Sequence, residues 1–182
     1  IHLASGAGFD LSEAGTKKNA AVSLVSDRSE VPAIDRAGPD ALSIEADQFA
    51  SALAGSNSRI KTVLEDQELI AGIGNAYSDE ILHAARLSPF APASGVDAPA
   101  LLETVREVLG RARDALIELP PGKIKAAKKR RLRVHGRTGK TCPVCGATIA
   151  EVSFADKSLQ YCPGCQTGGK KLSDRRMDRL LK

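Results

Sequence analysis

The sequence predicts an α+β protein made of several small domains, and three features indicate this class. Residues 1–25 alternate short apolar runs with Gly, Ser and Thr, a pattern typical of two or three strands. Residues 43–119 carry apolar side chains at helical spacing. Residues 142–165 hold a short alternating segment between two cysteine pairs, which favours a β-hairpin. A chain of 182 residues can supply a core to two or three such modules.

The central region is expected to contain four helices, at residues 43–54, 59–67, 76–86 and 98–119. Gly55 provides the stop for the first of them. The last helix turns one apolar face inward, and the residues of this face are expected to be core: Leu101, Leu102, Val105, Val108, Leu109, Ala112 and Leu116. Two prolines and a glycine end this helix, and the run that follows them is expected to be a basic linker, at residues 123–133.

Charge is unevenly distributed along the chain. Residues 1–119 hold 10 Lys/Arg against 18 Asp/Glu, a net charge of −8, whereas residues 120–182 hold 16 against 4, a net charge of +12. A basic block of this size attracts polyanions, so nucleic acid is the expected partner, with a solvated basic tail as the alternative. No apolar run is long enough to span a membrane. The first residues, Ile1 and His2, show neither an initiator Met nor a signal-peptide pattern, which suggests a fragment or a processed chain.

All four cysteines lie within 24 residues, as Cys142 and Cys145, a gap of sixteen residues, then Cys162 and Cys165. Each C-x-x-C motif places two thiolates on one tight turn, and two such turns complete a tetrahedron around one Zn²⁺ ion. Four protein ligands leave no open position, so this zinc is expected to be structural. Two redox dithiols or an iron–sulfur cluster are the alternatives. The clustering, without a secretion signal, indicates a reducing compartment.

Two features predict contacts with phosphate. Gly72 and Gly74 permit close approach of the backbone to a ligand, and Asn75 is expected to cap the next helix, whose first N–H groups form an anion site. Lys157 is expected near the tip of a hairpin, where a cation meets phosphate. The alternatives are a turn that only packs two helices and an edge lysine that limits sheet association. The histidines lack ligand spacing and are expected to be surface or packing residues: His2, His83 and His135.

Several of these motifs resemble one family, the formamidopyrimidine-DNA glycosylase and endonuclease VIII family. The run IAGIGNAY and its neighbours, at residues 60–67, 70–82 and 88–89, resemble the family's helix–two-turns–helix element. The family's C-terminal zinc finger is resembled by residues 134–137, the cysteine ribbon and Gln166.

The resemblance implies three parts. Residues 1–40 correspond to the last part of an N-terminal β-sandwich catalytic domain, with its exit junction at residues 38–42. Residues 41–133 correspond to a helix–two-turns–helix DNA-binding domain with the basic linker, and residues 134–182 to a zinc-finger domain. The fold class is therefore expected to be α+β and multidomain, with a β-sandwich remnant, a helical domain and a zinc-ribbon hairpin.

By this resemblance, Asn75 binds the phosphate backbone at the lesion, with Lys61 a weaker candidate in the same region. Gly72 and Gly74 are the other DNA-binding candidates of this motif. Lys157 stands where the family has a finger arginine that contacts phosphate and assists the final elimination step. It is therefore both a DNA-binding and a catalytic candidate. Lysine keeps the charge but lacks the bidentate fork of arginine, so the phosphate role is the better supported of the two.

The resemblance also implies a function. Family members flip oxidised bases from the duplex, excise them and cleave the strand at the abasic site, with an N-terminal proline as nucleophile and a glutamate after it. This chain begins Ile1-His2, and residues 16–18 replace the family's Arg-Arg-Phe. The expectation is base-excision repair by a bifunctional DNA glycosylase/AP lyase, represented here by its DNA-binding C-terminal part and inactive alone. The alternative is a non-catalytic zinc-ribbon nucleic-acid-binding module. The expected setting is a bacterial cytoplasmic monomer, associated with the nucleoid and acting on damaged double-stranded DNA.

Overall fold

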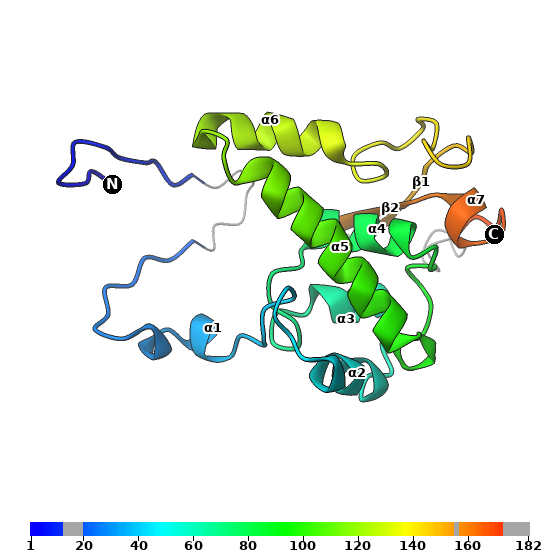
Figure 1. Cartoon of the computed structure of the whole chain (residues 1–182), viewed down its shortest axis with the longest axis horizontal. Coiled ribbons are helices and arrows are strands. Elements are labelled where there is room, and N and C mark those ends of the chain that lie inside the picture. The colour runs from blue at the N-terminus through cyan, green and yellow to red at the C-terminus, as the bar shows by residue number, and fades with distance from the viewer. Residues whose placement is uncertain (13–19, 155–156, 173–182) are drawn as a thin grey trace. The chain divides into compact units, whose positions relative to one another are not determined.

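A computed structural model of the chain describes residues 1–12, 20–154 and 157–172. The chain divides into two compact units, Ile1–Arg36 and Ala37–Lys182. The second unit contains helices α2 to α7 and the cysteine ribbon, so contacts between those parts can be described (Figure 1). No helix in the described ranges is long and apolar enough to cross a membrane.

The described residues of the first unit, 1–12 and 20–36, form little regular structure. They include a bridge between His2 and Gly8, a 3-10 turn at Arg28–Glu30 and the short helix α1 at Pro32–Asp35. Asp27 caps the 3-10 turn, and its carboxylate accepts a hydrogen bond from the Ser29 amide at 2.8 Å. The expected strands are not formed over residues 1–12 and 20–25, so that prediction is wrong for them. The physical reason is that two or three short strands do not make a stable sheet without further partners.

Helices form the larger part of the second unit. Their bounds are Ala46–Ala54 (α2), Ile60–Glu65 (α3), Asn75–Ala84 (α4), Ala98–Leu116 (α5) and Pro121–Arg131 (α6), with a 3-10 turn at Ala93–Gly95. α5 packs on both α2 and α4 (Figure 1). The shared core includes Phe49, Ile81 and Val105, each with no exposed surface. The four helices predicted from apolar spacing are therefore confirmed, with ends shifted by a few residues.

The basic segment after α5 is a helix, and the prediction of a linker is wrong there. α6 spans Pro121–Arg131 and begins with a proline at its first position, where a missing N–H costs nothing. Eight of its eleven residues are Ala, Lys or Arg, and all three are strong helix formers. Its last turn is basic, which complements the negative end of the helix dipole. Ala127 is its buried contact.

The cysteine ribbon follows α6. It contains a two-stranded antiparallel hairpin, β1 at Ala150–Phe154 and β2 at Lys157–Tyr161, and a single helical turn, α7, at Pro163–Gln166. Two small clusters of buried side chains hold the ribbon together. One lies around the cysteines, with Val134 and Ile149, and the other around Tyr161 and the hairpin. The predicted hairpin is confirmed.

Candidate nucleic-acid interface and metal cluster

The turns between α3 and α4 are fixed by one amide side chain. The Gln67 Oε1 atom accepts a hydrogen bond from the Gly72 amide at 3.0 Å, and its Nε2 group donates to the Ile73 carbonyl at 2.7 Å. Gly72 has φ +96°, in the left-handed region that favours glycine. Gly74 has an extended backbone. A Cβ placed on it would have no heavy atom within 4 Å, so the space around the start of α4 is open.

The N-terminus of α4 differs from the expectation in one respect. Gly74, and not Asn75, is the N-cap residue, and no side chain caps this helix. Asn75 is the first helical residue, and its Nδ2 group donates to the Ser158 carbonyl of β2 at 2.9 Å. The predicted capping role of Asn75 is therefore wrong, because its side chain points across to the hairpin. The first N–H groups of α4 remain without a capping side chain, which is the arrangement that binds anions.

A cleft of about 290 Å³ opens beside this terminus, and Asn75 and Ser158 line it. Arg59, which is exposed, lines the same cleft. Its guanidinium carbon lies 3.7 Å from the centroid of the Phe90 ring. Stacking of this kind fixes the planar guanidinium in place and leaves its N–H groups for an anion. Arg59 thus adds a cation to the site that the sequence motifs did not single out.

Lys61 also lines this cleft, but most of its side chain is buried. Its ammonium lies 2.7 Å from Asp79 Oδ1 and 2.9 Å from Glu65 Oε1, and it donates to Ser78 Oγ at 2.7 Å. The side chain is 8% exposed. Lys61 therefore neutralises internal carboxylates and holds the first turn of α4, and its expected phosphate contact stays a prediction.

Lys157 is the first residue of β2, where its backbone pairs with Phe154 of β1. The hairpin tip at residues 155–156 and the Lys157 side chain lie outside the described part of the structure. The expected phosphate and elimination roles of Lys157 therefore stay predictions as well.

The four cysteines converge although their pairs are far apart in sequence. The sulfur of Cys142 lies 3.9 Å from that of Cys165, and the sulfur of Cys145 lies 3.3 Å from that of Cys162. These spacings suit thiolates around one tetrahedral ion, because Zn–S bonds of about 2.3 Å place neighbouring sulfurs roughly 3.8 Å apart. A Cβ at Gly164 would stand 2.9 Å from the Cys145 sulfur, so the second motif needs glycine between proline and cysteine.

The thiols of the two C-x-x-C motifs differ in their pKa. A backbone hydrogen bond from Ala147 lowers the pKa of Cys145 to about 7. Burial raises the pKa of Cys142, but hydrogen bonds from the Cys145 and Val144 amides and from His83 outweigh it and lower that pKa below its ordinary value. Burial raises the pKa of Cys162 and that of Cys165. A cation is what stabilises four such sulfurs as thiolates in one cluster, so the donor set fits zinc.

One face of α4 joins the ribbon to the helices. The buried carboxylate of Glu80 accepts hydrogen bonds from three consecutive amides, those of Arg133, Val134 and His135, at 2.8, 2.9 and 2.9 Å. Asp79, whose side chain has no exposed surface, accepts from the Gln160 amide at 3.1 Å.

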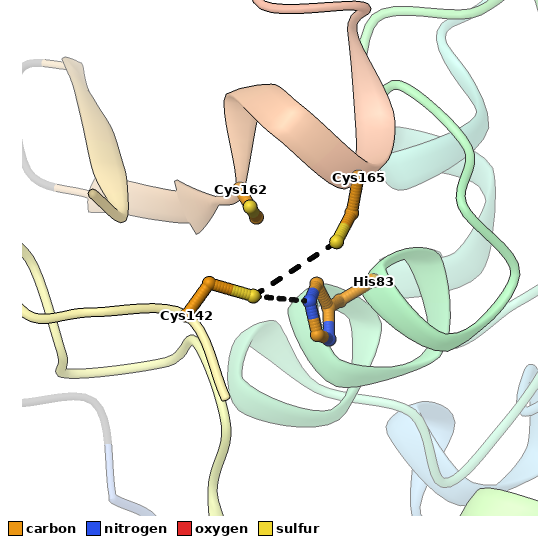
Figure 2. Close-up of side chains that lie close together, drawn as sticks. All are labelled: His83, Cys142, Cys162 and Cys165. Carbon is orange, nitrogen blue, oxygen red and sulfur yellow. Dashed lines mark hydrogen bonds between the residues drawn. The ribbon is translucent and has the colours of Figure 1, made fainter. Parts of the chain in front are cut away.

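The same Asp79 carboxylate lies 2.7 Å from the Nδ1 atom of His135. His83 completes the face, with Nε2 at 3.3 Å from the Cys142 sulfur (Figure 2). The expectation that His83 and His135 only pack or face solvent therefore missed specific polar contacts. The sequence signal for these contacts is the run of polar and charged residues in α4. The structure buries several of them, among them Asp79, Glu80 and His83.

A helical pair joined by two tight turns and followed by a cysteine-clustered hairpin is the architecture of a DNA-binding module with an attached zinc finger. The model of the formamidopyrimidine-DNA glycosylase H2TH domain matches residues 37–117, and the model of the zinc finger found in FPG and IleRS matches residues 139–168. A formamidopyrimidine-DNA glycosylase-like protein of Mycobacterium tuberculosis is 58% identical over 148 residues, which make up 80% of this chain and 94% of the relative.

The chain belongs to the formamidopyrimidine-DNA glycosylase family, and it matches the C-terminal part of the family's longer members. The enzyme from Thermus thermophilus is 38% identical over 157 residues, which cover 79% of this chain and 58% of the enzyme. The chain therefore spans little more than half the length of such relatives. The matched finger and the sulfur cluster together fit one structural zinc ion.

Solved structures agree with this assignment. The crystal structure of the MutM (Fpg) protein from Thermus thermophilus superposes with a TM-score of 0.67 at 35% identity, over 80% of this chain and 59% of that one. The complex between Lactococcus lactis Fpg and DNA containing an abasic site gives a TM-score of 0.67 at 27% identity, over 79% and 57%. The expected mixed fold class, a helical domain followed by a zinc-ribbon hairpin, is confirmed.

Proposed function

We propose that residues 37–182 bind damaged double-stranded DNA through its phosphate backbone and so serve base-excision repair. The observation that carries this proposal is the uncapped N-terminus of α4, with Asn75 and the stacked Arg59 in one cleft. One amide hydrogen of Asn75 is used by Ser158, and the second remains for a phosphate oxygen. Likeness to Fpg solved with abasic-site DNA supports the choice of partner.

We further propose that Cys142, Cys145, Cys162 and Cys165 hold the zinc ion, in a closed structural site. Zinc holds the four thiolates together and fixes the ribbon, so that the β2 carbonyl at Ser158 meets Asn75. The Lys157 ammonium is proposed to reach a second phosphate from the same strand, because β2 starts at this residue.

Changing Asn75 to Ala tests the interface. We expect affinity for duplex DNA containing an abasic analogue to fall by about 1–3 kcal/mol, since a hydrogen bond to a charged oxygen is removed. Fluorescence anisotropy at fixed salt measures it, with thermal unfolding of the same sample to show that the fold is kept. Gln48 on α2 supplies the control, because Gln48→Ala changes an exposed amide outside the cleft and is expected to leave affinity unchanged. Equal affinity of Asn75→Ala and wild type would contradict the proposed site.

The basic helix α6 is proposed to extend the interface. It carries six Lys/Arg and no acidic residue, and no ion pair of its side chains is found within the described ranges. Lys125 and Lys129 stand at i and i+4, an arrangement that destabilises a helix until an anion compensates it. Lys128 lies 4.7 Å from the centroid of the Tyr77 ring, which anchors α6 beside α4.

The salt dependence of DNA affinity distinguishes phosphate contacts made by α6 from a basic surface that is only solvated. We expect the double change Lys125→Gln and Lys129→Gln to flatten the slope of log affinity against log salt by roughly 0.9 for each phosphate that the variant no longer neutralises. The matched pair Arg111→Gln and Arg113→Gln removes the same charge from α5, where both arginines already have carboxylate partners. Equal slopes for the two double variants would leave only a general charge effect and refute a contact by α6.

The removal of oxidised bases and the AP-lyase step are proposed to need residues outside this chain. A Schiff base requires an unprotonated amine at the sugar, whereas solvated lysine side chains in general carry a proton near neutral pH. Lys61 is held by two carboxylates. We expect no borohydride trapping of the 182-residue chain on abasic DNA above the rate of a lysine-rich control protein, and trapping above that rate would overturn the proposal.

A second candidate function is a binding protein without base chemistry. The Mycobacterium tuberculosis relative favours it, because the matched segment makes up 94% of that protein and leaves it little room for a catalytic domain. The two candidates are separated by adding a Pro-Glu-initiated catalytic domain to the same chain. Restored base release supports a split enzyme, and continued binding without release supports the binding protein.

A further inference from the structure

A histidine from the helical part of the protein reaches the metal cluster of the ribbon. His83 lies in α4 and is 3% exposed. Its Nε2 atom is 3.3 Å from the Cys142 sulfur, and the ligand atoms of His83, Cys142, Cys162 and Cys165 all lie within 4.8 Å of one another (Figure 2). With Cys145, more candidate ligands therefore gather here than the four that zinc takes.

The second ring nitrogen distinguishes a zinc ligand from a hydrogen-bond donor. A histidine that binds a metal almost always donates its other N–H to a carboxylate, a carbonyl or water. The Nδ1 atom of His83 is buried and has no hydrogen-bond partner in the part of the chain that the structure describes. The proton therefore belongs on Nε2, where the Cys142 sulfur can accept it. Four cysteines already complete the tetrahedron without His83.

A hydrogen-bond donor at this position would stabilise the negative charge of the cysteine thiolates. Four thiolates around one Zn²⁺ retain net negative charge, and Cys142 and Cys162 are 2% and 0% exposed, so water cannot solvate them. The Cys142 sulfur also accepts a hydrogen bond from the Val144 amide at 3.5 Å. An imidazole N–H is a further partner for this buried sulfur, and it comes from the helix on which the ribbon rests.

We propose that His83 donates its Nε2–H to the Cys142 thiolate and acts as a positioning residue of the zinc site. It thereby links metal binding to the docking of the ribbon on α4, together with Asp79 and Glu80 on the same helix. This inference rests on the four-cysteine ligand set proposed above and not on the DNA-binding role of the chain.

Two substitutions in the full zinc-loaded chain test the role. His83→Phe keeps an aromatic ring but removes the donor, and we expect zinc affinity, measured by chelator competition, to fall about 10- to 100-fold. His83→Gln offers an amide N–H at similar reach and is expected to restore most of the affinity. His2→Phe, in the first unit, is the control and is expected to change nothing. Unaltered zinc affinity in His83→Phe, or a Gln variant as weak as the Phe variant, would refute the proposal.

Cobalt substitution supplies a second readout. The sulfur-to-cobalt absorption of the Co²⁺-loaded chain is expected to have the intensity of four thiolates in wild type and in both variants. Intensity of only three thiolates in wild type, rising or shifting on His83→Phe, would make His83 a ligand and overturn the donor role. Neither readout involves DNA, so failure here is separate from failure of the proposed DNA interface.

Discussion

Removal of zinc is expected to unfold the ribbon while the helices persist. The hydrophobic cluster around the two C-x-x-C motifs contains four buried residues, and two of them are the cysteines Cys142 and Cys162. So small an apolar core supplies little stability, whereas structural zinc contributes an apparent ~10–16 kcal/mol in such modules. The helical core is larger and contains no cysteine. Chelation should therefore erase the amide NMR signals of residues 139–168 and leave most helical circular dichroism.

Two controls accompany the metal experiment. Elemental analysis of the untreated chain is expected to give one zinc per chain, and readdition of zinc to restore the ribbon signals. Cys162→Ser should reproduce the effect of chelation without a chelator present. A metal-free chain with intact ribbon signals would show that the cysteines hold the fold by themselves, and the structural role of zinc would be refuted.

The second large effect is expected at Asp79. Its fully buried carboxylate binds the Lys61 ammonium, lies against His135 and accepts from the Gln160 amide. Asp79→Ala removes one of the two carboxylates that pair with the buried Lys61 ammonium. It also leaves the Gln160 amide without its hydrogen-bond acceptor. Removing one member of a buried pair costs about 3–5 kcal/mol, so the free energy of unfolding should fall by that amount.

Urea denaturation of the zinc-loaded chain measures this loss. Asp114→Ala is the matched control, since Asp114 also pairs with a cation, Arg113, but has 67% of its side chain exposed. An exposed pair contributes about 0–1 kcal/mol, so this variant should unfold near the wild-type midpoint. Equal losses for the two variants would mean that burial of Asp79 does not determine its contribution.

Local pattern predicted much of this molecule, because its helices and its cysteine motifs are encoded at short range. The apolar face of α5 repeats every three to four residues, and the two C-x-x-C motifs fix their own turn geometry. The sequence predicts a linker for the basic run before the ribbon, since two prolines and a glycine end the helix that precedes it. Alanines at 126 and 127 and a proline at the first helical position favour α6 instead.

Contacts across long stretches of sequence could not be predicted in this way. Asn75 meets Ser158 across 83 residues, and His83 meets Cys142 across 59. Each partner alone has an ordinary local role, as a helix cap or as a packing residue, and local rules assign that role. The pairs exist only because α4 is covered by the ribbon, which is a property of the tertiary fold.

The position of α4 between two sets of partners has a consequence for the entropy of DNA binding. On one side it packs against α5 and α3, and on the other it holds the ribbon through Asp79, Glu80 and His83. The Asn75 end of α4 and the β2 strand that starts at Lys157 therefore lie in one compact unit and are joined by the hydrogen bond from Asn75 to Ser158. When the groups that contact DNA phosphates are already in place before binding, little conformational entropy is lost on binding. Most of the free energy of each phosphate contact then contributes to affinity.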